Sequence, residues 1–203
     1  MKANKQLLNP RYKGETPIEE EDLLDLLMPL STLKQVDQAE ALNITEAHVW
    51  LYERKRKFKA EEILQVTWVK KLHKEMYGNV WSYAGSFRQR DTTPGVPKAQ
   101  ISREISALLD DTHQKIENKT EWNLTNHEIA LHLSFKAVWI HPFKNGNGRW
   151  SRELANALLF SLKDELFTWG ETISIKKRHD VMMKAIYAAD EGDLSLLMAF
   201  AKM

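Results

Sequence analysis

Residues 126–162 read NHEIALHLSFKAVWIHPFKNGNGRWSRELANALLFSL, and this stretch decides the fold. From residue 126 to residue 140 the apolar side chains cover nearly the whole circumference of a helix, and residues 149–162 repeat that character. A helix that is apolar all round is buried in the core of its domain. The stretch therefore predicts two central, buried helices of an all-α domain, joined by a polar turn.

The turn between these two helices has the features of a phosphate site. Gly146 and Gly148 lack a Cβ, so the main chain can turn tightly and approach a ligand. The helix that restarts at residues 147–149 directs N–H groups and the positive end of its dipole into the turn. Arg149 and Arg152 share one helical face, where two guanidinium groups can hold successive phosphates. His141 lies across the turn and can accept a proton near neutral pH, which predicts a general base beside a polyphosphate.

The rest of the chain is predicted to be helical on both sides of this centre, apart from one segment. Phe143 is predicted to anchor the turn in the core. Residues 79–98 contain two Gly and two Pro, which predicts a short hairpin around residues 91–95. Residues 1–17 have no periodicity and are predicted to form an irregular arm. The remaining helical patterns cover residues 18–28, 31–43 with Ser31 as cap, 45–55 starting at Thr45, 60–77, 99–117, 174–190 and 193–202.

Composition restricts the class of protein. With 203 residues and 43% hydrophobic content the chain can bury one core, and we expect an N-terminal arm with helices (1–58) packed on a main domain (59–203). The 29 Lys and Arg nearly balance the 28 Asp and Glu, which argues against a dedicated nucleic-acid binder. Without cysteine there are no disulfides. The absence of a long apolar run predicts a soluble, cytoplasmic protein without a membrane span.

The turn also resembles a known family signature. HPFKNGNGR at 141–149, followed by Arg152, resembles the Fic signature H-P-F-x-(D/E)-G-N-G-R-x-x-R and departs from it only at Asn145. Residues 80–88 (VWSYAGSFR) are similar to the W-A-G-x-x-R segment before the family's flap, and residues 185–200 to its final helices. The resemblance covers about residues 60–203 and is closest to the small Fic proteins called mobile mystery protein B. It implies the Fic fold, a helical bundle with a short β-hairpin flap.

The resemblance further implies a protein adenylyltransferase that moves AMP from ATP, with Mg²⁺, to a Ser, Thr or Tyr hydroxyl of a target protein. His141 would take the hydroxyl proton, and Phe87, Arg88 and Val96 of the flap would bind the target. The implied catalytic residues are His141, Asn147, Arg149 and Arg152, and the implied nucleotide contacts are Lys144, Asn145, Gly146, Asn147, Gly148, Arg149 and Arg152.

Two positions of the signature keep other activities open. Asn145 stands where the family has an acidic magnesium ligand, and a neutral amide is a weak ligand for Mg²⁺. A nucleotide-binding module with little or no turnover is therefore an alternative. Gly148 stands where the Doc-type branch has Lys and phosphorylates its target, so Gly148 favours AMP transfer over Doc-like phosphotransfer.

Control of the activity and nucleic-acid binding are also left open by the sequence. No complete (S/T)-x-x-x-E-(G/N) motif of the family's inhibitory helix occurs in the chain, so a restraining carboxylate would come from Asp37 or Glu40, or else from a separate antitoxin-like inhibitor. A third alternative, DNA binding through the basic residues 54–59, is disfavoured by the net charge of +1.

Overall fold

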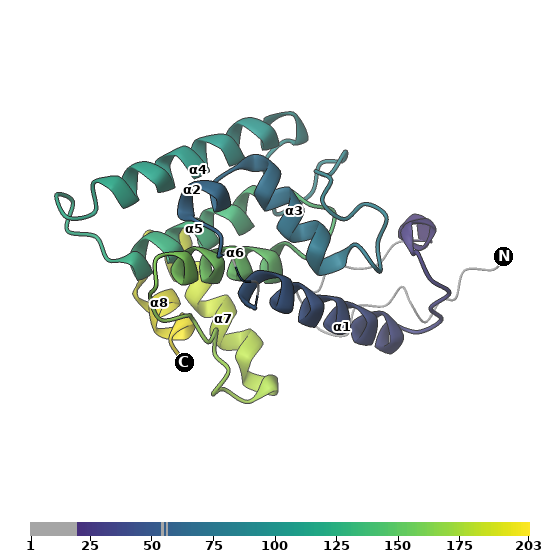
Figure 1. The fold of residues 1–203 in the computed structure, drawn as a ribbon. Helices are drawn as coiled ribbons and strands as arrows, with labels where there is room; N and C mark the ends of the chain where they lie inside the picture. The colour runs from purple at the N-terminus through teal and green to yellow at the C-terminus, as the bar shows by residue number, and fades with distance from the viewer. Residues whose placement is uncertain (1–19, 54, 56) are drawn as a thin grey trace.

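The computed structural model describes residues 20–53, 55 and 57–203, and these residues form a helical bundle (Figure 1). The described part of the chain contains eight α-helices and no β-sheet, so the predicted all-α fold is confirmed. None of its helices combines the length and the apolarity needed to cross a membrane. The elements are, in chain order, η2 (Glu20–Asp25, a 3-10 helix), α1 (Leu33–Tyr52), α2 (Ala60–Ile63), α3 (Val66–Tyr77), η3 (Lys98–Gln100, a 3-10 helix), α4 (Ile101–Glu117), α5 (Asn126–Ile140), α6 (Asn147–Ser161), α7 (Ile175–Asp190) and α8 (Ser195–Ala201).

Helices α5 and α6 lie side by side at the centre of the bundle (Figure 1). The predicted helix 126–140 is confirmed at both ends, and α6 begins two residues before the predicted residue 149. Thr125 and Glu128 form a capping box, in which the Thr125 hydroxyl accepts the Glu128 amide and the Glu128 carboxylate accepts the Thr125 amide. Helices α4 and α8 pack against α5, α3 packs against α6 and α1, and α7 packs against α8. The turn that joins α5 to α6 is therefore held from several sides.

Helix α1 replaces two helices predicted from the sequence. The prediction of separate helices at 31–43 and 45–55 was wrong, because Thr45 does not cap a new helix. Its hydroxyl donates instead to the Ala41 carbonyl one turn earlier, at 2.9 Å, so the helix continues through it. The N-cap of α1 is Thr32 rather than Ser31, and Gln35 completes its capping box. As a result one continuous helix extends along α3.

Two further helix predictions differ from the structure. Where a helix at 18–28 was expected, the described part is a 3-10 helix that ends at Asp25, because the chain then pairs with residues 80–82 in an extended conformation. The Leu27 amide donates to the Val80 carbonyl at 2.9 Å, and Leu26 forms an antiparallel bridge with Trp81. The predicted helix 60–77 is interrupted where Gln65 adopts an extended conformation and becomes the N-cap of α3.

The segment predicted as a hairpin forms no strand ladder among the described residues. Each of its arms bonds instead to the chain that leaves α5: the Arg88 amide donates to the Pro142 carbonyl at 2.9 Å, and the Val96 amide donates to the Ile140 carbonyl at 3.3 Å. We call residues 85–97 the flap segment. Its two arms are joined by a side chain, since the Arg88 guanidinium donates to the carbonyl of Val96.

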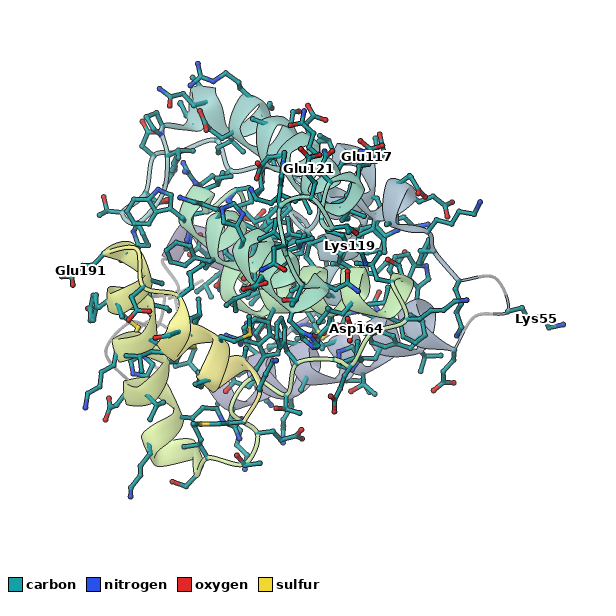
Figure 2. All side chains as sticks on the ribbon, turned by 90° about the vertical axis from the view of Figure 1, so that its left-hand side faces the viewer. Lys55, Glu117, Lys119, Glu121, Asp164 and Glu191 are labelled. Carbon is teal, nitrogen blue, oxygen red and sulfur yellow. The ribbon has the colours of Figure 1, made fainter. Side chains whose placement is uncertain are left out.

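Some sequence predictions fall outside the described residues. The predicted arm at residues 1–17 lies there, and so do Arg54 and Arg56 of the basic run that was considered for DNA binding. Between them, Lys55 projects from the periphery of the molecule, away from the central helices (Figure 2).

Candidate phosphate-binding and catalytic site

The turn between α5 and α6 is shaped by two residues in the left-handed conformation. His141 ends α5 with φ 54° and ψ 58°, and Gly146 precedes α6 with φ 79° and ψ 0°. Between them Phe143 is fully buried, which confirms its predicted role as an anchor. Asn147 closes the turn from within, because its Oδ1 accepts the Phe143 amide at 2.9 Å and its Nδ2 donates to the Phe143 carbonyl at 2.8 Å. The Asn147 side chain, a predicted nucleotide contact, is thus engaged by the main chain of the turn.

The first amides of α6 are available to a ligand. The Trp150 amide bonds back to the turn, at 2.9 Å from the Gly146 carbonyl. The amides of Asn147 and Gly148 have no hydrogen-bond partner among the residues that the structure describes. Together with the positive end of the α6 dipole, these groups form an anion-binding mouth. The Gly146 amide does not contribute to it, since it donates to Oδ1 of Asn145 at 2.7 Å.

The two signature arginines have different surroundings. Arg149 forms an ion pair with Glu40 of α1, with NH2 2.7 Å from Oε2, and its guanidinium lies over the Tyr77 ring. Arg152 forms no ion pair with any described acidic residue, and its NH1 contacts Sδ of Met182 at 3.5 Å. Burial and the nearby guanidinium groups lower the pKa of Arg152. A desolvated cation without a carboxylate favours binding of an anion such as phosphate.

His141 lies at the rim of this site. Its ring is half-buried, and Nδ1 is shielded from solvent without a hydrogen-bond partner among the described residues. Burial and the positive charge of Arg88 lower the pKa of His141 below its ordinary value of 6.5. The ring is therefore mostly uncharged at neutral pH, as a general base requires.

Lys144 is directed away from the anion-binding mouth. Its ammonium group pairs with Asp22 at 2.5 Å and with Asp25 at 2.8 Å, both in η2. Burial alone would lower the pKa of Lys144, but the two carboxylates outweigh burial and raise it. The predicted nucleotide contact thus holds the N-terminal segment against the turn.

The residues of the turn do not fit a magnesium ion held by the protein. Asn145 is neutral, and its Oδ1 already accepts the Gly146 amide. Among the described residues, no three His, Asp or Glu side chains are grouped as a metal site would require.

The flap residues predicted to contact a target are partly internal. Arg88 is only 5% exposed, and its guanidinium donates to the carbonyls of His141 at 2.7 Å and Arg90 at 2.6 Å as well as to that of Val96. It holds the flap segment and the His141 backbone together, and its hydrogen bonds face inward. Phe87 and Val96 are half-exposed, with Phe87 packed against Phe143.

The face of α3 beneath the turn is a part of the site that was not predicted from the sequence. Val69 accepts the Trp150 indole N–H at 3.0 Å, and Tyr77 packs under Gly146. His73 lies between them on the same face and is fully buried. The sequence carried a signal for this face, because Val69, His73 and Tyr77 are spaced by four residues and so lie on one side of the helix. Polar side chains such as those of His73 and Tyr77, when buried on an apolar face, need hydrogen-bond partners elsewhere in the fold.

The comparisons with known proteins match the part of the chain that contains this turn. The Fic/DOC family model matches residues 63–159. Protein adenylyltransferase Fic of Aedes aegypti is 26% identical over 130 residues, which are 64% of this chain and 25% of that protein. The aligned region thus spans about a quarter of the length of the curated relatives that the chain matches.

Solved structures share the fold. Fic-1 from C. elegans is similar with a TM-score of 0.64 and 19% identity, covering 87% of this chain and 50% of that chain. BepC, a VirB-translocated effector of Bartonella tribocorum with bound AMPPNP, is similar with a TM-score of 0.64 and 16% identity, covering 100% of this chain and 97% of that chain. The expectation of the Fic fold is confirmed by these likenesses.

The two glycines of the turn predict opposite responses to alanine. A Cβ on Gly146 would lie 2.7 Å from the Tyr77 ring in a residue with φ 79°. We expect Gly146→Ala to lower the free energy of unfolding by about 2–4 kcal/mol through backbone strain and overpacking. In the matched variant Gly148→Ala the nearest atom is Arg152 NH1 at 3.9 Å, so stability should be retained. Urea denaturation measures both, and equal stability of the two variants would contradict the described turn.

Proposed function

Because the chain belongs to the Fic/DOC family, we propose that it is a protein adenylyltransferase that transfers AMP from ATP to a Ser, Thr or Tyr hydroxyl of a target protein. The observation that carries this proposal is the anion-binding mouth of α6, where free amides lie beside the guanidinium of Arg152, which forms no ion pair with a described carboxylate. The AMPPNP bound to the BepC structure shows that the shared fold accommodates an adenine nucleotide in that protein.

In this proposal the phosphates are held mainly by α6. The amides of Asn147 and Gly148 bind the α-phosphate, and Arg152 and Arg149 neutralise the outer phosphates. The Asn147 side chain contributes indirectly by fixing the Phe143 peptide. Preorganised donors of this kind need no rearrangement when negative charge develops on the phosphate oxygens.

His141 acts as the general base. It accepts the proton of the target hydroxyl, whose oxygen forms a bond to the α-phosphorus of ATP. The bond between the α-phosphorus and the oxygen that bridges to the β-phosphate breaks, and pyrophosphate leaves. Since the transfer needs one proton removal and otherwise positioning of charge, the described groups suffice for the roles that the chain itself must supply.

Glu40 provides an internal restraint on this activity. Its carboxylate pairs with Arg149 and also accepts the Trp81 indole N–H at 2.7 Å, so it is fixed at the site although it belongs to α1. A carboxylate that occupies Arg149 competes with the phosphates for the guanidinium. Glu40 is one of the two acidic residues considered from the sequence, and its contact with Arg149 favours an internal restraint over a separate antitoxin-like inhibitor.

Labelled ATP distinguishes the candidate reactions. We expect wild-type protein to transfer label from [α-³²P]ATP to protein in a cell lysate, and His141→Ala to reduce that rate by about 10²–10⁴-fold. The matched control His113→Ala removes an exposed histidine of α4 and should retain activity. Transfer of γ-label instead of α-label would indicate Doc-like phosphotransfer. ATP binding without transfer of either label would indicate a nucleotide-binding module.

The pH dependence of transfer reports on His141. Because its pKa lies below 6.5, its basic form is populated throughout the neutral range. We expect the acid limb of kcat/KM to have its midpoint below pH 6.5, with a fall of about tenfold per pH unit below that midpoint. A midpoint of the acid limb at or above pH 6.5 would contradict the assigned base.

Release of Arg149 should increase nucleotide binding. Glu40→Gln removes the negative charge while its amide oxygen can still accept the Trp81 indole N–H. We expect the affinity for ATP to rise about tenfold, the equivalent of about one charge-assisted hydrogen bond. Glu46→Gln, an exposed position of the same helix, serves as the control. Calorimetric titration measures the affinity for ATP, and equal affinities of wild type, Glu40→Gln and Glu46→Gln would contradict the restraint by Glu40.

A further inference from the structure

His73 joins the phosphate-binding turn to the flap segment. It lies in the middle of α3 with no exposed surface, and both of its ring nitrogens bond to the main chain of other segments. Nε2 lies 3.0 Å from the carbonyl oxygen of Asn145, and Nδ1 lies 3.0 Å from the amide nitrogen of Gly85. One side chain therefore connects the first residue of the flap segment to the middle of the turn.

These two partners determine the tautomer of the ring. A carbonyl oxygen can only accept, so Nε2 of His73 carries the proton, while the Gly85 amide can only donate, so Nδ1 presents its lone pair. The imidazole must be uncharged to make both bonds. Burial is the main reason that the pKa of His73 falls to about 4, so this state persists throughout the neutral range.

The ring has little freedom to leave this position. It stacks on Phe143 with ring centroids 3.8 Å apart and an interplanar angle of 20°, and it contacts Tyr77 on its own helix at 4.8 Å. Gly85 is confined as well, because a Cβ there would lie 2.9 Å from Cβ of Lys74. One imidazole ring, bonded on both sides, therefore spans the gap between Gly85 of the flap segment and Asn145 of the turn.

We propose that His73 is a positioning residue, which holds the turn and the flap segment in one register so that the amides of Asn147 and Gly148 are aligned for phosphate. The carbonyl that it holds belongs to Asn145, two residues before the first free amide of α6. Without these bonds, two partly buried main-chain groups lose their partners, and the turn must shift to bring them to water. The inference rests on the proposed function for its meaning in transfer, but the alignment itself can be measured without transfer.

A pair of substitutions separates hydrogen bonding from volume. His73→Phe retains a flat ring against Phe143 and removes both bonds, whereas the carboxamide of His73→Gln offers one donor and one acceptor about as far apart as the two ring nitrogens. Leu72→Ala, a neighbouring buried position, is the control for loss of stability alone. In each variant, hydrogen exchange is measured at the amide of Gly85 and across residues 145–149, and ADP affinity by calorimetry.

We expect the Gly85 amide to exchange slowly in wild type and in His73→Gln and at least tenfold faster in His73→Phe. ADP affinity should fall at least tenfold in His73→Phe, recover in His73→Gln and remain within about twofold of wild type in Leu72→Ala. The nitrogen chemical shifts of His73 should show the Nε2–H tautomer from pH 5 to pH 8.

Three results would overturn the inference: unchanged Gly85 exchange in His73→Phe, equal losses of affinity in His73→Phe and Leu72→Ala, or protonation of His73 near pH 6.5. If wild type neither binds ADP nor transfers label, the proposed function fails, while hydrogen exchange still decides the role of His73. If wild type is active and His73→Phe binds ADP normally, only the inference fails.

Discussion

The amides at the start of α6 constrain everything around them, because a helix cannot satisfy its own first N–H groups. At the N-terminus of most helices, water or a side-chain cap supplies the missing acceptors. Here Gly146, which has no side chain to cap with, takes the N-cap position, and the Asn147 side chain turns back to Phe143. The Asn147 side chain therefore stabilises the shape of the turn, and the amides of Asn147 and Gly148 stay accessible to a ligand.

The positive charges around the turn differ in how far the protein has already neutralised them. Lys144 is paired with two carboxylates of η2, Arg149 with one carboxylate of α1, and Arg152 with none among the described residues. In a partly buried site, a cation without a counter-charge attracts an anion more strongly than one already paired. Three basic residues within nine positions of sequence consequently have three different surroundings: Lys144 is held by η2, Arg149 is held by α1, and Arg152 is the one that our proposal assigns to phosphate.

The sequence predicted the centre of the molecule well and its periphery less well, for a physical reason. The extent of α5, the start of α6 near the turn and the burial of Phe143 all follow from local patterns of apolar residues and glycine. The contacts of Lys144 and Arg88 do not follow from local patterns. Asp25, a partner of Lys144, lies 119 positions away in the sequence, and the His141 carbonyl that Arg88 binds comes near only in the folded chain. A basic residue in a phosphate motif has the same local sequence whether it faces a ligand or a distant carboxylate. The hairpin predicted around residues 91–95 was wrong for the same reason, since the amides of Arg88 and Val96 bond to the carbonyls of Pro142 and Ile140 rather than to each other's strand.

The indole of Trp81 shares an acceptor with the site. Its N–H bonds to the carboxylate of Glu40 that also binds Arg149, and its main chain bridges to Leu26 of the N-terminal segment. Any event that draws Glu40 away from Arg149 therefore alters the polarity around a buried chromophore. Among the seven tryptophans of the chain, Trp81 is thus the one whose fluorescence we expect to change when Glu40 leaves Arg149.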